Sequence, residues 1–186
     1  HSRFRWIAGA KTGTPAEDLI VDHFNMDGPW DAMTTGTGGT SLWLPPNGDR
    51  MEDIKATSVS TAPGSQLLRA DFDNDGHSDV LVIHAAKASL LRGAANGTFE
   101  DVTALLPEGT GCVAAEAADL DEDGDLDLIL VAESGAISLL TNNGGNANEW
   151  TDVVTRAIGD DPQFPSNRVN MHRSEEHTSE LQSLTN

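Results

Sequence analysis

The sequence contains three copies of one acidic segment of nine residues, placed at equal intervals. The copies begin at residues 23, 71 and 119, so each starts 48 residues after the one before. They read HFNMDGPWD, DFDNDGHSD and DLDEDGDLD, with glycine at position six and aspartate at positions five and nine. Two equal intervals are hard to obtain by chance, and a repeat of about 40–50 residues is typical of a β-propeller or a solenoid.

The second and third copies place carboxylates at positions one, three, five and nine of a short loop. These are Asp71, Asp73, Asp75 and Asp79 in the second copy, and Asp119, Asp121, Asp123 and Asp127 in the third. Two like charges about 4 Å apart repel by roughly 1 kcal/mol in water and by about 4 kcal/mol at an effective dielectric constant of 20. The loops therefore need a counter-ion to close. Ligands that are all oxygen favour Ca²⁺, which takes about six to eight of them.

Short apolar runs separated by turn residues flank each acidic segment, which indicates strands. The expected strands, four per repeat, are residues 18–21, 32–35, 41–44 and 51–54, then 66–70, 80–84, 89–92 and 99–103, then 113–118, 128–132, 136–140 and 150–153. Four strands make one propeller blade, and three blades cannot close a ring of the usual size of roughly four to eight. We therefore predict an all-β fold, a partial β-propeller of about three four-stranded blades with Asp-rich calcium loops.

The repeat divides the chain into segments of similar length. We expect residues 1–17 to be the end of a preceding blade or a linker, and residues 158–172 to start the next element. The three blades are 18–65, whose loop is degenerate, 66–111, and 112–157, where three residues are inserted around 142–146. Because the sequence starts without Met and stops within the pattern, we interpret it as a fragment of a longer protein.

Residues 173–186 differ in character from the repeats. The run RSEEHTSELQS, which starts at Arg173, resembles the translation of a common sequencing-library adapter. We therefore leave this segment out of the fold prediction as an artefactual tail. A polar helical tail is the alternative for it.

The pattern Asp-x-Asp-x-Asp-Gly-x-x-Asp, followed by an apolar strand, resembles the FG-GAP/VCBS repeat family, which includes the calcium-binding propeller blades of integrin α-subunits. The resemblance covers roughly residues 18–155. It implies Ca²⁺ bound by the side chains at positions one, three, five and nine and by the backbone carbonyl at position seven. The ligands would be Asp71, Asp73, Asp75, Asp79 and the carbonyl of His77, and Asp119, Asp121, Asp123, Asp127 and the carbonyl of Asp125. Residues 158–172 faintly resemble the start of an ASPIC/UnbV-type module.

The first copy departs from this pattern at two ligand positions. His23 takes the place of the first aspartate and Asn25 takes the place of the second, whereas Asp27 and Asp31 remain. Imidazole is a poor ligand for a hard cation, and two negative charges are missing. We predict that the site of Asn25, Asp27 and Asp31 is weak or vacant, and that other contacts keep its turn.

Three other interpretations of the acidic segments stay open at this point. An EF-hand shares the first half of the motif, but it needs a glutamate at position twelve and flanking helices. Val82 and Leu130 occupy that position here. A parallel β-solenoid would have a shorter repeat, and a solvated acidic turn would hold no metal.

Charge and cysteine content limit the classes of function. The formal net charge is −19, which disfavours nucleic acid and anionic membrane surfaces as partners. No segment approaches the roughly 20 apolar residues of a membrane-spanning helix. Cys112 is the only cysteine in the sequence, so we expect neither an intrachain disulfide nor a zinc cluster, and we expect its side chain to be a buried small apolar group.

Aromatic and glycine residues also have predicted places. Trp43, Phe99 and Trp150 stand at recurring strand positions and are expected in the core between blades. Trp30 lies inside the degenerate segment, where it would be exposed and available to a partner. The glycine-rich run at residues 36–39 is expected to be a hairpin turn and not a phosphate-binding loop.

The leading functional prediction is a calcium-binding, non-catalytic scaffold for binding or adhesion, placed extracellularly, in the periplasm or on the cell surface. Weak calcium sites with Kd of about 10⁻⁴–10⁻³ M suit extracellular calcium. The partner would be an unidentified protein or carbohydrate, in addition to neighbouring blades. The alternative is a propeller appended to a secreted carbohydrate-active or other hydrolytic enzyme. A hydrolase that uses these same carboxylates is disfavoured, because a catalytic metal usually keeps an open position.

Overall fold

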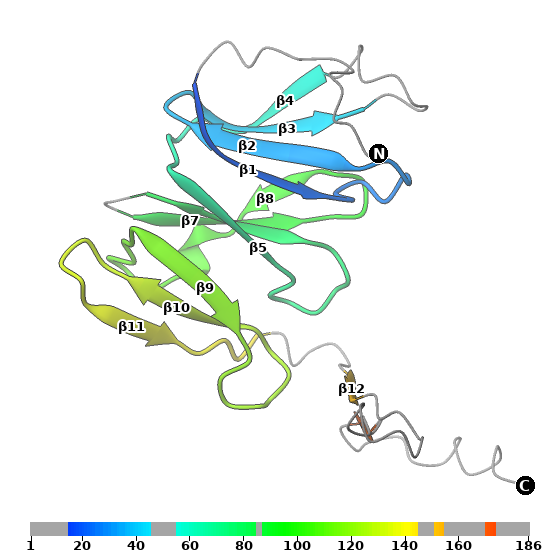
Figure 1. Ribbon diagram of the computed structural model, residues 1–186, viewed down its shortest axis with the longest axis vertical. Coiled ribbons are helices and arrows are strands. Elements are labelled where there is room, and N and C mark those ends of the chain that lie inside the picture. Colours follow the sequence, from blue (N-terminus) through cyan, green and yellow to red (C-terminus); the bar gives the residue numbers. More distant parts are fainter. Residues whose placement is uncertain (1–14, 46–54, 85–86, 145–150, 155–169, 174–186) are drawn as a thin grey trace, which may run out of the picture.

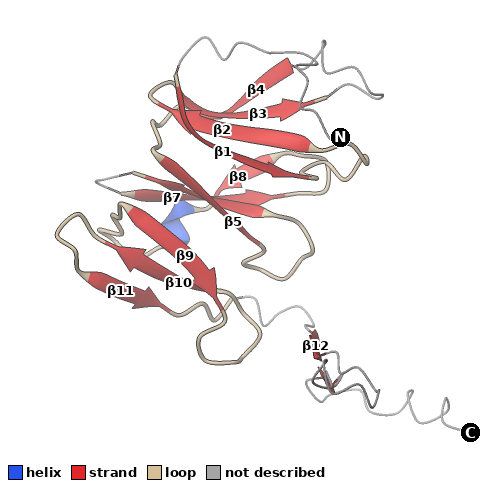
Figure 2. Cartoon of the chain, in the orientation of Figure 1, coloured by secondary structure: helices blue, strands red, loops and turns tan. Residues whose placement is uncertain are grey.

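The computed structural model describes residues 15–45, 55–84, 87–144, 151–154 and 170–173. Strands dominate these residues, and the one helical element among them is the 3₁₀ turn η2 (Thr103–Leu105), as Figure 2 shows. No helix in this part of the chain is long and apolar enough to cross a membrane. The predicted all-β fold is confirmed.

Three antiparallel sheets follow one another along the chain (Figure 1). The first contains β1 (Ala16–Asp22), β2 (Asp31–Gly36), β3 (Gly39–Leu44) and β4 (Lys55–Ser60), and the second contains β5 (Gln66–Ala70), β6 (Asp79–Ile83), β7 (Ala88–Gly93) and β8 (Phe99–Asp101), each in chain order. The third contains β9 (Ala114–Ala118), β10 (Asp127–Val131) and β11 (Ile137–Leu140), with β10 in the middle. Such up-and-down sheets are the blades of a partial β-propeller.

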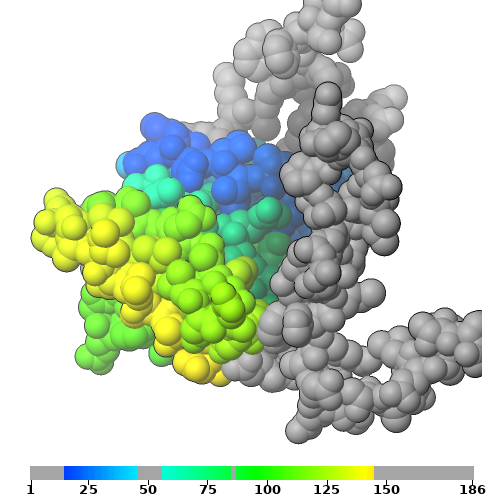
Figure 3. All heavy atoms as spheres, turned by 60° about the horizontal axis from the view of Figure 1, so that its bottom comes forward, coloured from blue at the N-terminus to red at the C-terminus, as the bar shows by residue number. Residues whose placement is uncertain are grey.

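The blades keep their chain order in space. The first strands of successive sheets, β1, β5 and β9, contact one another in that order. In the space-filling view, the first blade (blue) lies along the top of the described body and the end of the third blade (yellow) lies at its left and lower edge (Figure 3). The strand bounds place each acidic segment between the first and second strands of its own blade.

The central strand β6 is buried on both faces, because one blade packs on each side of it. Val80 and Val82 pack against the first blade, whereas Leu81 and Ile83 point the opposite way and pack against the third. This division follows from the two-residue period of a strand. Complete burial of such a side chain contributes about 1.5–3 kcal/mol. The apolar run after the second acidic segment therefore holds three blades together.

The glycine-rich run forms the hairpin turn between β2 and β3, as predicted. Gly39 has φ +99°, and a Cβ at this position would lie 2.3 Å from the carbonyl oxygen of Ser60 in β4. Both observations require glycine. The run therefore serves close strand packing.

The third blade differs from the prediction, because its sheet has three strands among the described residues. The expected fourth strand is present as β12 (Thr151–Val154), but it pairs with β13 (Asn170–Arg173) instead of β11. Backbone N–H and C=O groups of an extended segment need partners, and β13 supplies them here. Arg173, the last residue of β13, is also the first residue of the adapter-like segment. The side chains of β11 are largely exposed.

The other predictions of local structure have clear outcomes. Strands flank both complete acidic segments, so the EF-hand alternative is wrong, and the antiparallel pairing excludes the parallel solenoid. Cys112 is fully buried and Trp43 is nearly so. Phe99 packs edge-on against Phe24 across the first two blades, with ring centroids 5.7 Å apart. Some predictions concern segments outside the described residues, namely the strand at 51–54, Trp150, and residues 1–14, 158–169 and 174–186. The prediction did not include β4.

Candidate metal centre

The three acidic segments have one common backbone shape. We call residues 23–31 the first loop, 71–79 the second loop and 119–127 the third loop. In the second and third loops, the residue at position four has a left-handed backbone conformation, with φ +54° at Asn74 and +62° at Glu122. The glycine at position six has one too, with φ +85° at Gly76 and +93° at Gly124. Left-handed conformations are uncommon outside glycine, and asparagine tolerates them better than most residues. Two such residues in each loop turn the chain back sharply, so that β5 and β9 continue into β6 and β10 as hairpins.

Three aspartates gather in each complete loop. Carboxylate oxygens of Asp71, Asp73 and Asp79 all lie within 4.8 Å of one another in the second loop. Asp119, Asp121 and Asp127 form the same group in the third loop. Positions one, three and nine of the sequence motif are therefore together in space in both copies.

The aspartate at position one organises the turn. In the second loop, Asp71 accepts the backbone N–H groups of Asp75 (3.1 Å) and Gly76 (2.9 Å). Asp119 accepts those of Asp123 (3.2 Å) and Gly124 (3.1 Å) in the third loop. The same carboxylate thus belongs to the three-carboxylate group and closes the turn.

The aspartate at position nine is buried and ties the loop to its sheet. Asp79 is 2% exposed, and its two oxygens accept the N–H groups of Phe72 (2.9 Å) and Gly93 (2.8 Å). In the third loop, Asp127 is fully buried. It accepts the N–H groups of Leu120 (3.0 Å) and Asn142 (2.7 Å). This residue therefore joins three pieces of chain, namely the loop, the second strand and the end of the third strand.

Positions five and seven have other roles in this structure. Asp75 accepts the N–H of His77 (2.8 Å), and Asp123 accepts the N–H of Asp125 (3.0 Å). Neither Asp75 nor Asp123 belongs to the three-carboxylate groups. The side chain of Asp125 is fully buried. Coordination by positions five and seven stays a prediction.

Burial and mutual repulsion disturb the acidity of these groups. The pKa of Asp79 is raised from 3.8 to about 6, chiefly by desolvation and in addition by the nearby Asp73 and Asp71, while the N–H donors of Gly93 and Phe72 oppose the rise. The pKa of Asp73 is raised by desolvation and then by Asp75 and Asp71, and the pKa of Asp121 is raised in the same way by desolvation, Asp123 and Asp127. The carboxylates are held closer together than their charges favour. An all-oxygen group of this kind fits a hard divalent cation.

This shift predicts how pH acts on the metal-free protein. The folded state binds the proton on Asp79 more tightly than the unfolded chain does, so the free energy of unfolding should fall as pH rises from about 4 to about 6. A shift of this size corresponds to at most about 3 kcal/mol. The check is urea unfolding of metal-stripped protein between pH 4 and 7, with Asp79→Asn measured in parallel. The variant should lose this part of the pH dependence, and identical curves for both proteins would contradict the assignment.

Two asparagines connect the second and third loops. Asn74 donates from Nδ2 to the carbonyl oxygen of Gly124 (3.3 Å) and to Oδ1 of Asp125 (3.0 Å). Asn142 donates from Nδ2 to the carbonyls of Phe72 (2.6 Å) and Leu126 (3.3 Å). Sequence reasoning missed both residues, because Asn74 stands at a free motif position and Asn142 lies where the repeat has its insertion. No signal within one repeat predicts a contact between repeats.

The first loop does not form such a group among the described residues. Its remaining acidic residues, Asp27 and Asp31, are hydrogen-bonded to Asn25. Trp30 is 66% exposed, as predicted from its place in the loop, and Met26 beside it is 62% exposed.

Comparison with known proteins gives one family match. Residues 71–130 match the model of the FG-GAP-like repeat. The matched region begins at the first aspartate of the second loop and contains the whole of the third loop. A search of curated proteins finds no match.

Proposed function

We propose, from the premise that this chain is an FG-GAP-type repeat protein, that it is a calcium-stabilised propeller scaffold for binding or adhesion. The second and third loops would each hold one Ca²⁺. The observation that carries this proposal is the pair of matching groups Asp71, Asp73, Asp79 and Asp119, Asp121, Asp127, each with carboxylate oxygens within 4.8 Å. Two independent copies of one geometry argue against a chance cluster of surface acids.

The bound ion would supply positive charge at the point where three carboxylates converge. The residues of the chain do the rest. Asp71 and Asp119 hold the turn through two N–H bonds each, and Asp79 and Asp127 hold the second strand and the end of the third strand. Neutralising each group removes the repulsion that raises the pKa of Asp79 and Asp73. Calcium would therefore stabilise the first hairpin of its blade.

The donor set favours a non-catalytic role in this proposal. A catalytic metal needs an open coordination position and a nearby base. Here one loop offers carboxylates at four positions, and no histidine or other base recurs at an equivalent place in both repeats. FG-GAP repeats are typical of extracellular proteins, and weak calcium sites suit that setting. The exposed Trp30 and Met26 of the first loop offer apolar surface to a protein or carbohydrate partner.

Calcium titration and melting test this function. At one hundred times Kd, each site should add about 2.7 kcal/mol to the free energy of unfolding. For a chain of this length that corresponds to a rise in Tm of roughly 5–10 °C per site. We expect calorimetry to find two ions per chain, and Mg²⁺ at equal concentration to give a smaller rise. An equal Tm in calcium and in chelator would refute the proposal.

The matched control for this experiment is the double variant Asp71→Asn, Asp119→Asn. Each substitution keeps the size of the side chain and removes one charge from one group. The variant should bind little or no calcium, and its Tm should be the same in calcium and in chelator. A wild-type response in this variant would place the calcium effect elsewhere on the acidic surface.

A further inference from the structure

We infer that the imidazole of His23 takes the structural place of a calcium ion in the first loop, which is therefore closed without metal. The comparison with a calcium site rests on the function proposed for the other two loops. The inference itself concerns contacts within the first blade.

The first loop has the backbone of a metal loop without the charge of one. Its position four, Met26, has φ +56°, and its position six, Gly28, has φ +107°. These values match the left-handed residues of the second and third loops. Methionine has no polar side chain to favour this conformation, so the shape must be maintained by contacts elsewhere in the loop.

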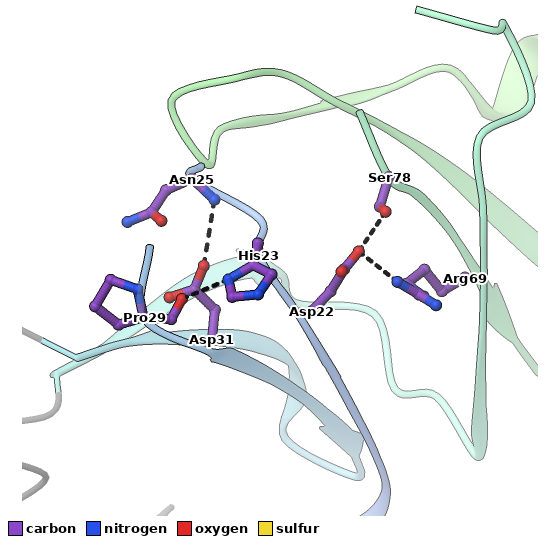
Figure 4. A network of polar contacts seen from close by, with 7 residues as sticks. All are labelled: Asp22, His23, Asn25, Pro29, Asp31, Arg69 and Ser78. Carbon is purple, nitrogen blue, oxygen red and sulfur yellow. Dashed lines mark hydrogen bonds and ion pairs between the residues drawn. The ribbon is translucent and has the colours of Figure 1, made fainter. Parts of the chain in front are cut away.

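His23 makes the contact that an ion would otherwise make. Its Nδ1 lies 2.9 Å from the carbonyl oxygen of Pro29 (Figure 4). A carbonyl oxygen only accepts, so Nδ1 carries the hydrogen. His23 stands at position one and Pro29 at position seven, the two positions that a calcium ion is predicted to join through a carboxylate and a carbonyl in the other loops. The ring also stacks on Trp30, with centroids 4.1 Å apart and planes inclined by 31°.

Asn25 supplies N–H donors to the acidic residues that remain. Its Nδ2 donates to Asp27 (2.9 Å), its Oδ1 accepts the N–H of Asp27 (3.2 Å), and its backbone N–H donates to Oδ2 of Asp31 (3.2 Å). In the second and third loops, positions one and three each carry a negative charge that the first loop lacks. The first loop thus has fewer negative charges and satisfies them with donors from the protein.

One buried oxygen needs a separate explanation, because it could be taken for a free metal ligand. Oδ1 of Asp31 is buried and has no hydrogen-bond partner among the described residues. In the second loop, the corresponding oxygen of Asp79 accepts the N–H of Gly93. The pairing registers of β2 with β3 and of β6 with β7 place Pro45 at the position of Gly93. Proline has no N–H, so this oxygen loses a backbone donor, and its lack of a partner does not require a metal.

Protein contacts also join the first loop to the second blade. Asp22, the residue before His23, forms an ion pair with Arg69 of β5 (2.7 Å) and accepts the hydroxyl of Ser78 in the second loop (Figure 4). The burial of Asp22 raises its pKa, but Ser78, Arg69 and the N–H of His23 outweigh this and lower the pKa overall. The start of the first loop is therefore fixed to the second blade by the contacts of Asp22 with Arg69 and Ser78.

Three variants test the inference. Wild type should bind two calcium ions per chain, and the double variant His23→Asp, Asn25→Asp, which restores the motif, should bind three. His23→Ala should still bind two ions, but its Tm in excess chelator should fall by about 2–4 °C, because it loses one hydrogen bond and one ring contact. His23→Gln keeps an N–H donor and should recover part of that loss. Nitrogen-15 shifts of the imidazole should show hydrogen on Nδ1.

Several results would overturn this inference. They are three ions bound by wild type, only two bound by a folded double variant, an unchanged Tm of His23→Ala in chelator, or an imidazole without hydrogen on Nδ1. If wild type binds no calcium, the proposed function fails, but the measurements on His23 in chelator still decide the inference.

Discussion

Replacing Asp79 with alanine should lower the free energy of unfolding of this protein by several kcal/mol. Asp79 is 2% exposed, and its oxygens accept the N–H groups of Phe72 and Gly93. Alanine leaves both donors buried without a partner, at a cost of about 1–3 kcal/mol each. It also removes one of the three gathered carboxylates. We expect the free energy of unfolding in saturating calcium to fall by about 3–5 kcal/mol.

The measurement is urea unfolding with saturating calcium, followed by calcium calorimetry of the folded variant. Glu116→Ala is the control, because Glu116 is an exposed acidic residue in β9. Exposed substitutions of this kind usually change stability by less than about 0.5 kcal/mol. Asp79→Ala should bind one calcium ion instead of two. If Asp79→Ala and Glu116→Ala unfold alike, the buried carboxylate does not hold the blade together.

Replacing Leu81 with alanine should lower the free energy of unfolding by about as much, although Leu81 lies outside the acidic loops. Leu81 is fully buried and belongs to the cluster that joins the second and third blades. It pairs with Leu68 on one side and Leu90 on the other. Buried Leu→Ala changes cost about 2–5 kcal/mol, from lost transfer free energy and from the cavity that remains. Domains of this size are stable by only about 5–15 kcal/mol, so the loss is a large fraction.

Leu139 is the matched control for Leu81. It is the same residue type in a strand of the adjacent blade, but it is 62% exposed. Leu139→Ala should lower the free energy of unfolding by less than about 0.5 kcal/mol. Hydrogen exchange should show faster opening of β9 and β10 in Leu81→Ala than in wild type, because Leu128 and Leu130 share its cluster. Equal stabilities of the two variants would show that the blades do not depend on this interface.

The sequence predicted most of the local structure correctly. The 48-residue spacing, the glycines at position six and the apolar runs placed β5, β6, β7 and β8 close to their observed bounds. It also predicted that the carboxylates at positions one, three, five and nine of each complete motif converge, and those at positions one, three and nine do form one group. These features depend on residues that are near one another in the chain: a left-handed turn needs glycine, and a strand alternates its faces. Local sequence contains that information.

Contacts between repeats were beyond the reach of the sequence. No pattern within one repeat shows that Asn74 reaches Gly124, that Asp22 pairs with Arg69, or that β12 pairs with β13.

The sequence alone therefore determined the repeat, most of the strands and the main members of the acidic groups, since each depends on residues less than about one repeat apart. Only the tertiary structure decided which loops touch, which buried oxygens are satisfied and how His23 closes the first loop. The physical reason is that hydrogen bonds and packing depend on distance in space. Blades that stack side by side bring together atoms that are some 50 residues apart in the chain, such as those of Asn74 and Asp125.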